Sequence, residues 1–148
     1  MTTVLIAEDN AVNRELLREL LEAYGYAVAE ACDGHEALRV IEQTHPDIVL
    51  LDIGMPGLDG FAVLRKIREN PSLVTLPILA VTAYAMQGDR ENVMSSGFDG
   101  YLSKPLNARA LANELEFLLR EGKDRNTHPN EVRDSQASGN RDAAGTGK

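Results

Sequence analysis

The segment 47–60 constrains the fold of this 148-residue chain more than any other stretch. Its apolar run, residues 48–51, is unbroken, which is typical of a strand buried on both faces of a parallel sheet. The run ends on the carboxylate of Asp52, and a loop rich in Gly and Pro follows. Open parallel sheets place their ligand sites at the carboxyl ends of their strands. The segment therefore predicts a parallel α/β sheet with Asp52 at its functional edge.

Strand-like and helix-like patterns alternate five times between residues 1 and 120. The predicted strands cover residues 4–7, 26–31, 47–52, 78–81 and 101–102, and a helical pattern follows each of them. The residues placed to cap four of these helices are Asn10, Asp33, Asp59 and Asn107. This alternation is the signature of a doubly wound α/β fold, in which helices cover both faces of a parallel sheet.

The first and the fourth predicted helices have apolar faces of different extent. The apolar side chains of the first, at helical spacing, are Val12, Leu16, Leu20 and Ala23, with Leu17, Leu21 and Tyr24 widening that face. The fourth, residues 84–96, contains Gly88 and has a thin apolar face. We therefore expect the fourth helix to be weakly anchored.

Charge and composition narrow the classes of partner and the cellular location. The net charge of −8 argues against nucleic acid as a direct partner, because a phosphate backbone favours Lys and Arg. No apolar stretch approaches the roughly 20 residues that a membrane span requires, and no signal peptide is evident. Cys32 is the single cysteine, which excludes an internal disulfide. We expect a cytoplasmic protein that does not insert into membranes.

The composition of the chain changes after Arg120. Residues 121–148 hold one Val as their only large aliphatic side chain, hold no aromatic residue, and carry five acidic and five basic residues. Such a segment buries too little apolar surface to offset the entropy lost on ordering. The sequence therefore predicts one folded domain, residues 1–120, and a disordered C-terminal tail, residues 121–148.

Polar side chains follow the predicted strands at the edge of the sheet where the strands end. They are Glu8 and Asp9 after the first strand, Asp52 after the third, Thr82 after the fourth and Lys104 after the fifth. Clustered carboxylates repel one another and require a cation, and oxygen ligands without nearby His or Cys suit Mg²⁺. A carboxylate beside a divalent metal, a Lys and a hydroxyl is equipped to attack phosphorus and form an acyl phosphate.

The order and spacing of four segments match those of response-regulator receiver domains in two-component signalling. The segments are residues 4–10, 51–60, 80–83 and 104–105. The sequence resembles that family over residues 3–120, and residues 81–86 and 101–105 further resemble single-domain receivers of the DivK type. The resemblance implies a flavodoxin-like (βα)5 fold, a doubly wound parallel sheet with strand order 2-1-3-4-5. It implies a signalling domain rather than an enzyme, one that assists its own phosphorylation and dephosphorylation.

The resemblance also implies roles for the site residues. Asp52 would take a phosphoryl group from the phosphohistidine of a sensor histidine kinase or a histidine phosphotransfer protein. Asp9, Asp52 and the Gly54 carbonyl would bind Mg²⁺ directly, and Glu8 would act mostly through water. Gly54 stands where many relatives carry a larger or polar side chain, so the resemblance does not extend to the lifetime of the phosphoryl group.

The same resemblance implies how the signal leaves the domain. Lys104 would contact the phosphoryl group, Thr82 and Tyr101 would form a switch pair, and the bond from Lys104 to Pro105 would be cis. Because Thr82 directly precedes the helix at 84–96, a hydroxyl drawn to the phosphoryl group would pull the start of that helix. We therefore expect phosphorylation-dependent binding of a downstream protein target to the face formed by residues 84–120.

Three alternatives stay open beside this interpretation. A phosphohydrolase with an aspartyl-phosphate intermediate would carry a second Asp two residues after Asp52, where this chain has Gly54. A flavodoxin-like cofactor binder would have a phosphate-cradling loop after the first strand, where this chain has Glu8 and Asp9. The third alternative is a receiver module that belongs to a larger hybrid kinase or phosphorelay protein.

Overall fold

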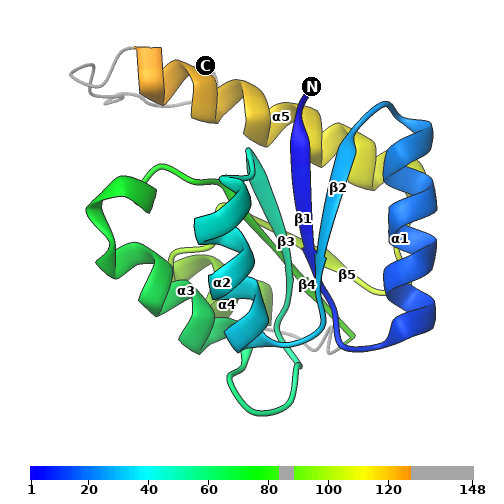
Figure 1. Cartoon of the computed structure of the whole chain (residues 1–148), viewed down its shortest axis with the longest axis horizontal. Helices are drawn as coiled ribbons and strands as arrows, with labels where there is room; N and C mark the ends of the chain where they lie inside the picture. The colour runs from blue at the N-terminus through cyan, green and yellow to red at the C-terminus, as the bar shows by residue number, and fades with distance from the viewer. Residues whose placement is uncertain (84–88, 128–148) are drawn as a thin grey trace.

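The computed structural model describes residues 1–83 and 89–127, and a parallel sheet lies at its centre (Figure 1). Within these residues the sheet has five strands in the order β2-β1-β3-β4-β5, and neighbouring strands are parallel. The strands are β1 Thr3–Ala7, β2 Ala27–Ala31, β3 Ile48–Asp52, β4 Ile78–Thr82 and β5 Gly100–Ser103. The helices are α1 Ala11–Ala23, α2 Gly34–Thr44, α3 Gly60–Glu69, α4 Asp89–Ser95 and α5 Ala108–Thr127, with a 3-10 helix η1 at Pro71–Leu73.

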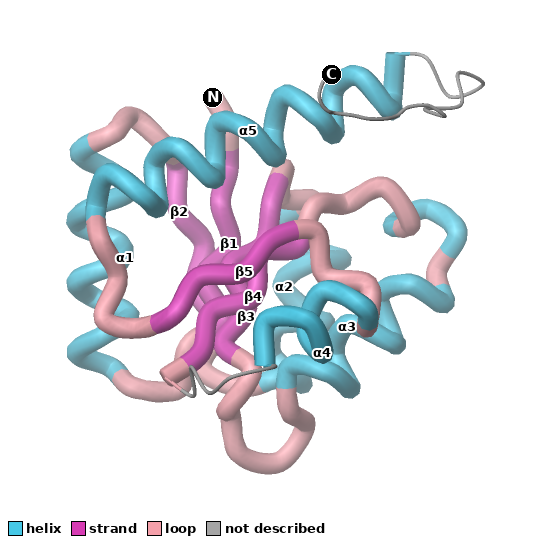
Figure 2. The backbone as a smooth tube through the Cα atoms, turned by 180° about the vertical axis from the view of Figure 1, so that it is seen from behind, coloured by secondary structure: helices cyan, strands magenta, loops and turns pink. Residues whose placement is uncertain are grey.

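Helices cover both faces of the sheet, with α1 and α5 on one face and α2, α3 and α4 on the other (Figure 2). The cause is the alternation of side chains along the central strands. In β3, Val49 and Leu51 pack with residues of α2, α3 and α4, whereas Ile48 and Leu50 pack with residues of α1 and α5. The predicted flavodoxin-like fold with strand order 2-1-3-4-5 is therefore confirmed.

Short polar side chains begin the helices that leave the functional edge of the sheet. Their carboxylate or amide oxygens accept the backbone N–H three residues on, at Asn10 from Asn13 (2.9 Å), Asp33 from Glu36 (2.8 Å), Asp59 from Ala62 (3.0 Å) and Asn107 from Ala110 (3.0 Å). Each bond satisfies a donor that the first turn of a helix leaves without an intrahelical partner. The four predicted caps are confirmed, and they determine where the loops after β1, β2, β3 and β5 end.

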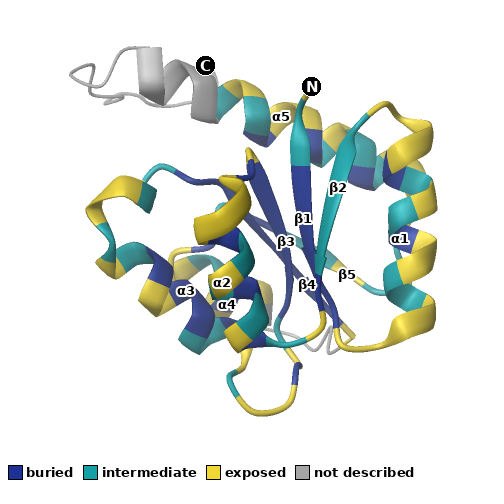
Figure 3. Ribbon diagram, viewed as in Figure 1, coloured by how far each residue is buried: buried dark blue, intermediate teal, exposed yellow. Residues whose placement is uncertain are grey.

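The first helix buries a narrower face than its sequence predicts (Figure 3). Leu17 and Leu21 are its buried side chains, whereas Val12 is 64% exposed and Leu16 is 59% exposed. The helical spacing grouped Val12 and Leu16 with the apolar face of this helix, but the structure leaves both side chains exposed. The reason is that α1 packs against β1 and the edge strand β2, so that one narrow stripe of the helix meets the sheet. An apolar patch consequently stays exposed near the start of α1.

The fourth helix, α4, is described from Asp89 to Ser95. The predicted beginning of this helix at Tyr84, together with Gly88, lies outside the described residues. Gly97, which follows the helix, has a φ of 113°, a left-handed conformation that glycine adopts without strain. Across residues 1–83 and 89–127, every helix falls short of the combined length and hydropathy that a bilayer span needs.

The last helix, α5, continues past the predicted end of the folded domain. It runs to Thr127, so residues 121–127 are helical, and the prediction that the disordered tail starts at residue 121 was wrong for these residues. A helix can outlast its apolar face because backbone hydrogen bonding propagates more easily than it begins. Residues 128–148 lie outside the described residues, and a disordered tail there stays a prediction.

Candidate functional site

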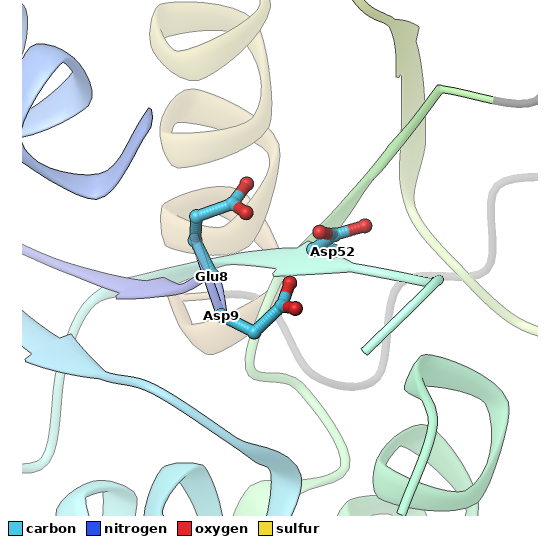
Figure 4. Close-up of side chains that lie close together, drawn as sticks. All are labelled: Glu8, Asp9 and Asp52. Carbon is cyan, nitrogen blue, oxygen red and sulfur yellow. The ribbon is translucent and has the colours of Figure 1, made fainter. Parts of the chain in front are cut away.

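The carboxylates of Glu8, Asp9 and Asp52 gather at the edge of the sheet where β1 and β3 end (Figure 4). One oxygen from each carboxylate lies within 4.8 Å of the others. Glu8 and Asp9 directly follow β1, and Asp52 is the last residue of β3, the strand beside it in the sheet. The pairing of two neighbouring parallel strands therefore brings together three oxygen ligands that could hold a metal ion.

Lys104 lies between two of these carboxylates. Its Nζ donates to Glu8 Oε1 at 2.7 Å and to Asp52 Oδ2 at 3.3 Å. Glu8 is 2% exposed and Asp52 is 7% exposed, so little water screens these charges. Burial lowers the pKa of Lys104, but the hydrogen bond to Glu8 and the charge of Asp52 outweigh burial and raise that pKa above its usual value. Lys104 therefore stays charged and offsets part of the negative charge at this edge.

The end of β3 and the loop after it hold Asp52 in place. The strand is buried along its whole length, and Asp52 stands opposite Val81 of β4. The Gly54 N–H donates to Asp52 Oδ1 at 3.0 Å. The loop closes where the Gly60 N–H donates to the Ile53 carbonyl at 3.1 Å, and a Cβ on Gly60 would lie 2.7 Å from Ile53 Cα. Backbone contacts therefore orient the Asp52 carboxylate from the loop that follows it.

Two contacts to the backbone of Glu8 were not predicted from the sequence. The Glu8 N–H donates to the Ala31 carbonyl of β2 at 3.0 Å, and Arg14 Nη1 donates to the Glu8 carbonyl at 2.8 Å. Arg14 Nε also pairs with Glu30 of β2 at 3.1 Å. The available signal was the position of Arg14 four residues after the cap Asn10, because helical side chains point back toward the helix start.

The remaining predicted site residues lie on β4, β5 and the loop that follows. Thr82 is buried at the end of β4, and its carbonyl accepts the Lys104 N–H at 2.8 Å. Tyr101 is half-buried on β5 opposite Ala80, and Arg90 Cζ lies 5.7 Å from the centre of its ring. The Lys104–Pro105 peptide bond is cis. The register of the sheet thus brings Thr82 and Lys104 to the edge where Asp52 lies, with Tyr101 further back along β5.

A groove of about 540 Å³ opens beside Lys104, between α1 and the loop after β5. Leu16 and Leu20 line it from α1, and Pro105 and Leu106 line it from the loop. The exposed part of Leu16 therefore belongs to an apolar surface that reaches the charged edge of the sheet.

A family model described as the response regulator receiver domain matches residues 4–116. The chain belongs to the response regulator receiver family. The resemblance seen in the sequence is thereby confirmed, and the chain contains a receiver domain of two-component signalling. Receiver domains bind Mg²⁺ at an acidic pocket and interact with histidine kinases or phosphotransfer proteins, and in this receiver the carboxylates of Glu8, Asp9 and Asp52 form an acidic group.

Similar proteins agree with the receiver assignment. The polar-differentiation response regulator DivK of Brucella ovis is 40% identical over 117 residues, which are 79% of this chain and 95% of that protein. The receiver domain of the sensor histidine kinase PA1611 from Pseudomonas aeruginosa, which has a magnesium ion coordinated in its active site cleft, is 37% identical with a TM-score of 0.74. The chemotaxis protein CheY4 of Vibrio cholerae is 29% identical with a TM-score of 0.74. Each of these two structures covers 80% of this chain and is itself covered to 98%.

The family assignment bears on the alternatives. A receiver is a signalling domain, so the assignment favours that function over a phosphohydrolase or a flavodoxin-like cofactor binder. The third alternative, a receiver module of a larger protein, stays open, since one of the similar structures is the receiver domain of a sensor histidine kinase.

Proposed function

We propose that Asp52 is the phosphoacceptor of this receiver and that its donor is a phosphohistidine on a sensor histidine kinase or a histidine phosphotransfer protein. The observation that carries the proposal is the setting of Asp52, which is 7% exposed at the end of the central strand with Lys104 Nζ 3.3 Å from Oδ2. In the transfer, an Asp52 oxygen bonds to phosphorus while the phosphorus–nitrogen bond of the donor breaks. The electron pair of that bond stays on the imidazole nitrogen, and the product is an aspartyl phosphate.

The proposed cofactor is Mg²⁺, held by Asp9, Asp52 and the Gly54 carbonyl, with Glu8 acting mostly through water. The donor set fits this ion, because three carboxylates each bring an oxygen to within 4.8 Å of the others and Mg²⁺ prefers oxygen ligands. The similar PA1611 receiver has a magnesium ion in its active site cleft. When bound, Mg²⁺ would neutralise the charge of the phosphoryl oxygens.

Lys104 and Thr82 are proposed to receive the phosphoryl group. The Nζ of Lys104 already makes charge-assisted hydrogen bonds to two carboxylates, and it would redirect one of them to a phosphoryl oxygen. Thr82, at the end of β4, would donate a hydrogen bond from its hydroxyl to another of these oxygens. Because both groups stabilise charge on the phosphoryl group, the domain would assist its own phosphorylation and dephosphorylation.

The groove beside Lys104 is the surface that we propose for the phosphodonor. Leu16 lines the groove and is 59% exposed, and Val12, one turn earlier in α1, is 64% exposed. A helix of the donor protein that packed across α1 would cover both side chains. Because the groove extends from Leu16 to Lys104, a histidine on that helix would reach the charged edge of the sheet. Contiguous exposed apolar side chains with a polar rim are typical of protein interaction sites.

A Leu16→Glu substitution should slow phosphotransfer from a phosphorylated donor protein by about tenfold or more, because it places a charge in an apolar contact. Acetyl phosphate requires no docking surface, so phosphorylation by this small donor should keep its wild-type rate. Val74→Glu is the matched control, since Val74 is 51% exposed but follows η1 at the opposite edge of the sheet. Time courses followed by mass spectrometry measure both reactions. An equal loss with both donors would contradict a docking role for the groove.

The downstream protein target is proposed to bind the face formed by residues 84–120. Residues 84–88 lie outside the described residues, so the proposal is supported by α4, β5 and α5. Arg68 of α3 donates from Nη2 to the Gly97 carbonyl at 3.4 Å and to Asp99 Oδ2 at 2.8 Å, which holds the segment after α4. Movement at Thr82 would therefore act on one end of this region while the other end stays attached to α3. A coupling of about 1–3 kcal/mol is enough for such a switch.

Beryllofluoride, a mimic of the phosphoryl group, tests the phosphoacceptor and the output face in one experiment. With Mg²⁺ present, backbone amide NMR resonances should shift near Asp9, Asp52 and Lys104, and also throughout α4 and β5. Shifts confined to the three loops would contradict the output face, and the absence of any shift would contradict the phosphoacceptor. A chain that ends at Thr127 should respond identically, because we propose no role in switching for the residues after α5.

We also propose a cytoplasmic location and no direct contact with nucleic acid. The exposed Cys32 is the single cysteine of the chain, so no internal disulfide requires an oxidising compartment. The net charge of −8 disfavours binding to a phosphate backbone, which repels an acidic surface. Both features are those expected of a protein whose partners are other signalling proteins.

A further inference from the structure

The side chain of Arg14 connects Glu8, which follows the end of β1, to Glu30 of the outermost strand β2. Its Nη1 donates to the main-chain carbonyl of Glu8 at 2.8 Å, and its Nε donates to the carboxylate of Glu30 at 3.1 Å. Arg14 is about one-fifth exposed and Glu30 about one-third exposed, so both are largely covered. Glu30 stands opposite Ile6 in the register of β1 and β2, close to the end of both strands.

We propose that Arg14 is a positioning residue for the acidic group, because it holds the peptide that joins Glu8 to Asp9. The proposal rests on the proposed function, since it concerns the affinity of that group for Mg²⁺. The Glu8 carbonyl and the Asp9 nitrogen belong to one rigid peptide plane. When Arg14 holds the carbonyl, it restricts rotation of the plane and hence the direction in which the Asp9 backbone sends its side chain.

The contacts around Glu8 and Asp9 explain why Arg14 matters more for the orientation of the Asp9 side chain than for that of the Glu8 side chain. The Glu8 carboxylate accepts from Lys104 Nζ at 2.7 Å and from the Asn10 N–H at 3.1 Å, and the Glu8 N–H donates to Ala31 at 3.0 Å. Glu8 is thus held at its side chain and at its nitrogen. Asp9 is exposed, so its orientation depends strongly on the peptide before it.

Glu30 is the anchor that orients Arg14. It also accepts a hydrogen bond from Arg18 Nε, and Arg18 in turn donates to Glu22 at 2.7 Å and to the Val28 carbonyl at 3.3 Å. The hydrogen bonds and charges of Arg18 and Arg14 lower the pKa of Glu30, so this carboxylate stays ionised. A guanidinium presents several N–H groups in one plane, which lets Arg14 bond to a carbonyl and a carboxylate at once.

Magnesium titration of the full chain, followed by amide NMR, tests the inference. Arg14→Gln should weaken the Mg²⁺ affinity by about 10-fold, the usual effect of removing a group that orients metal ligands. Arg18→Gln is the matched control, because Arg18 contacts the same Glu30 but makes its backbone contact at Val28 rather than Glu8. Its Mg²⁺ affinity should stay within about twofold of wild type, as expected for a residue that does not itself contact the acidic group.

Arg14→Lys separates position from charge. Lysine keeps the positive charge but is a single point donor, so it would not hold both Glu8 and Glu30 and should also bind Mg²⁺ weakly. Wild-type affinity in Arg14→Lys, or an equal loss in the Arg14→Gln and Arg18→Gln variants, would overturn the positioning role. Wild-type affinity in Arg14→Gln would overturn it as well while leaving the proposed function intact. A wild-type chain that binds no Mg²⁺ would overturn both.

Discussion

Phosphoryl incorporation will be lost when Asp52 is replaced by Asn. After incubation with acetyl phosphate and Mg²⁺, the wild-type chain should gain the mass of one phosphoryl group, and the variant should gain none. An amide lacks the anionic oxygen that attacks phosphorus. Its oxygen can still accept the Gly54 N–H, which Asp52 Oδ1 accepts at 3.0 Å, so the loop keeps its conformation. Intact-protein mass spectrometry measures the result directly.

Asp59→Asn is the control for the loss of a carboxylate from the same loop. Asp59 is exposed and caps α3 through the Ala62 N–H, and Asn is an equally good cap. This variant should be labelled to the wild-type extent, and removal of Mg²⁺ by a chelator should prevent labelling of both chains. If Asp52→Asn is labelled as fully as wild type, another residue is the acceptor and the proposed function is wrong in its main point.

Gly34→Ala will destabilise the fold by about 3 kcal/mol, the upper part of the range for overpacking. Gly34 begins α2, where a Cβ would overlap the Leu58 carbonyl oxygen and lie 2.8 Å from Val63 Cγ2. The carbonyl belongs to the backbone of the loop between β3 and α3, so it cannot rotate away as a side chain would. The same loop carries Gly54, and its displacement should also reduce the rate of phosphorylation. Urea denaturation measures the change in unfolding free energy.

Gly57→Ala separates overlap from backbone strain in that loop. Gly57 has a φ of 76° and open space around its Cβ position, so the substitution should cost about 1–2 kcal/mol through the left-handed conformation alone. Gly34→Ala should therefore have the larger effect of the two. If both variants lose the same small amount of stability, the loop is free to move away from α2, and close packing at Gly34 does not hold it.

The sequence alone determined that the chemistry gathers at one edge of a parallel sheet. Unbroken apolar runs such as 48–51 require cover on both faces, which helices between parallel strands provide. Because all strands of such a sheet point the same way, a carboxylate after β1 and another after β3 must lie at the same edge of the sheet. The four helix caps were predictable for a similar reason, since each depends on a side chain and a backbone group three residues apart.

Periodicity did not determine the order of the strands. Right-handed crossovers reduce the number of possible orders, but the choice of 2-1-3-4-5 came from the resemblance to receiver domains. Periodicity also did not predict how far α5 extends. The sequence places an apolar stripe on this helix up to Leu119, whereas the backbone continues to Thr127 without one.

Only the tertiary structure decided which helical side chains are buried and which distant residues meet. The apolar positions of α1 span more than one stripe, and its rotation against β1 and β2 buried Leu17 and Leu21 while leaving Val12 and Leu16 exposed. The contact of Arg14 with the Glu8 carbonyl likewise depends on how far α1 lies from the sheet. Local patterns record the spacing of residues along one element. The rotation and distance between elements are determined by the packing of all of them together, so no single segment contains that information.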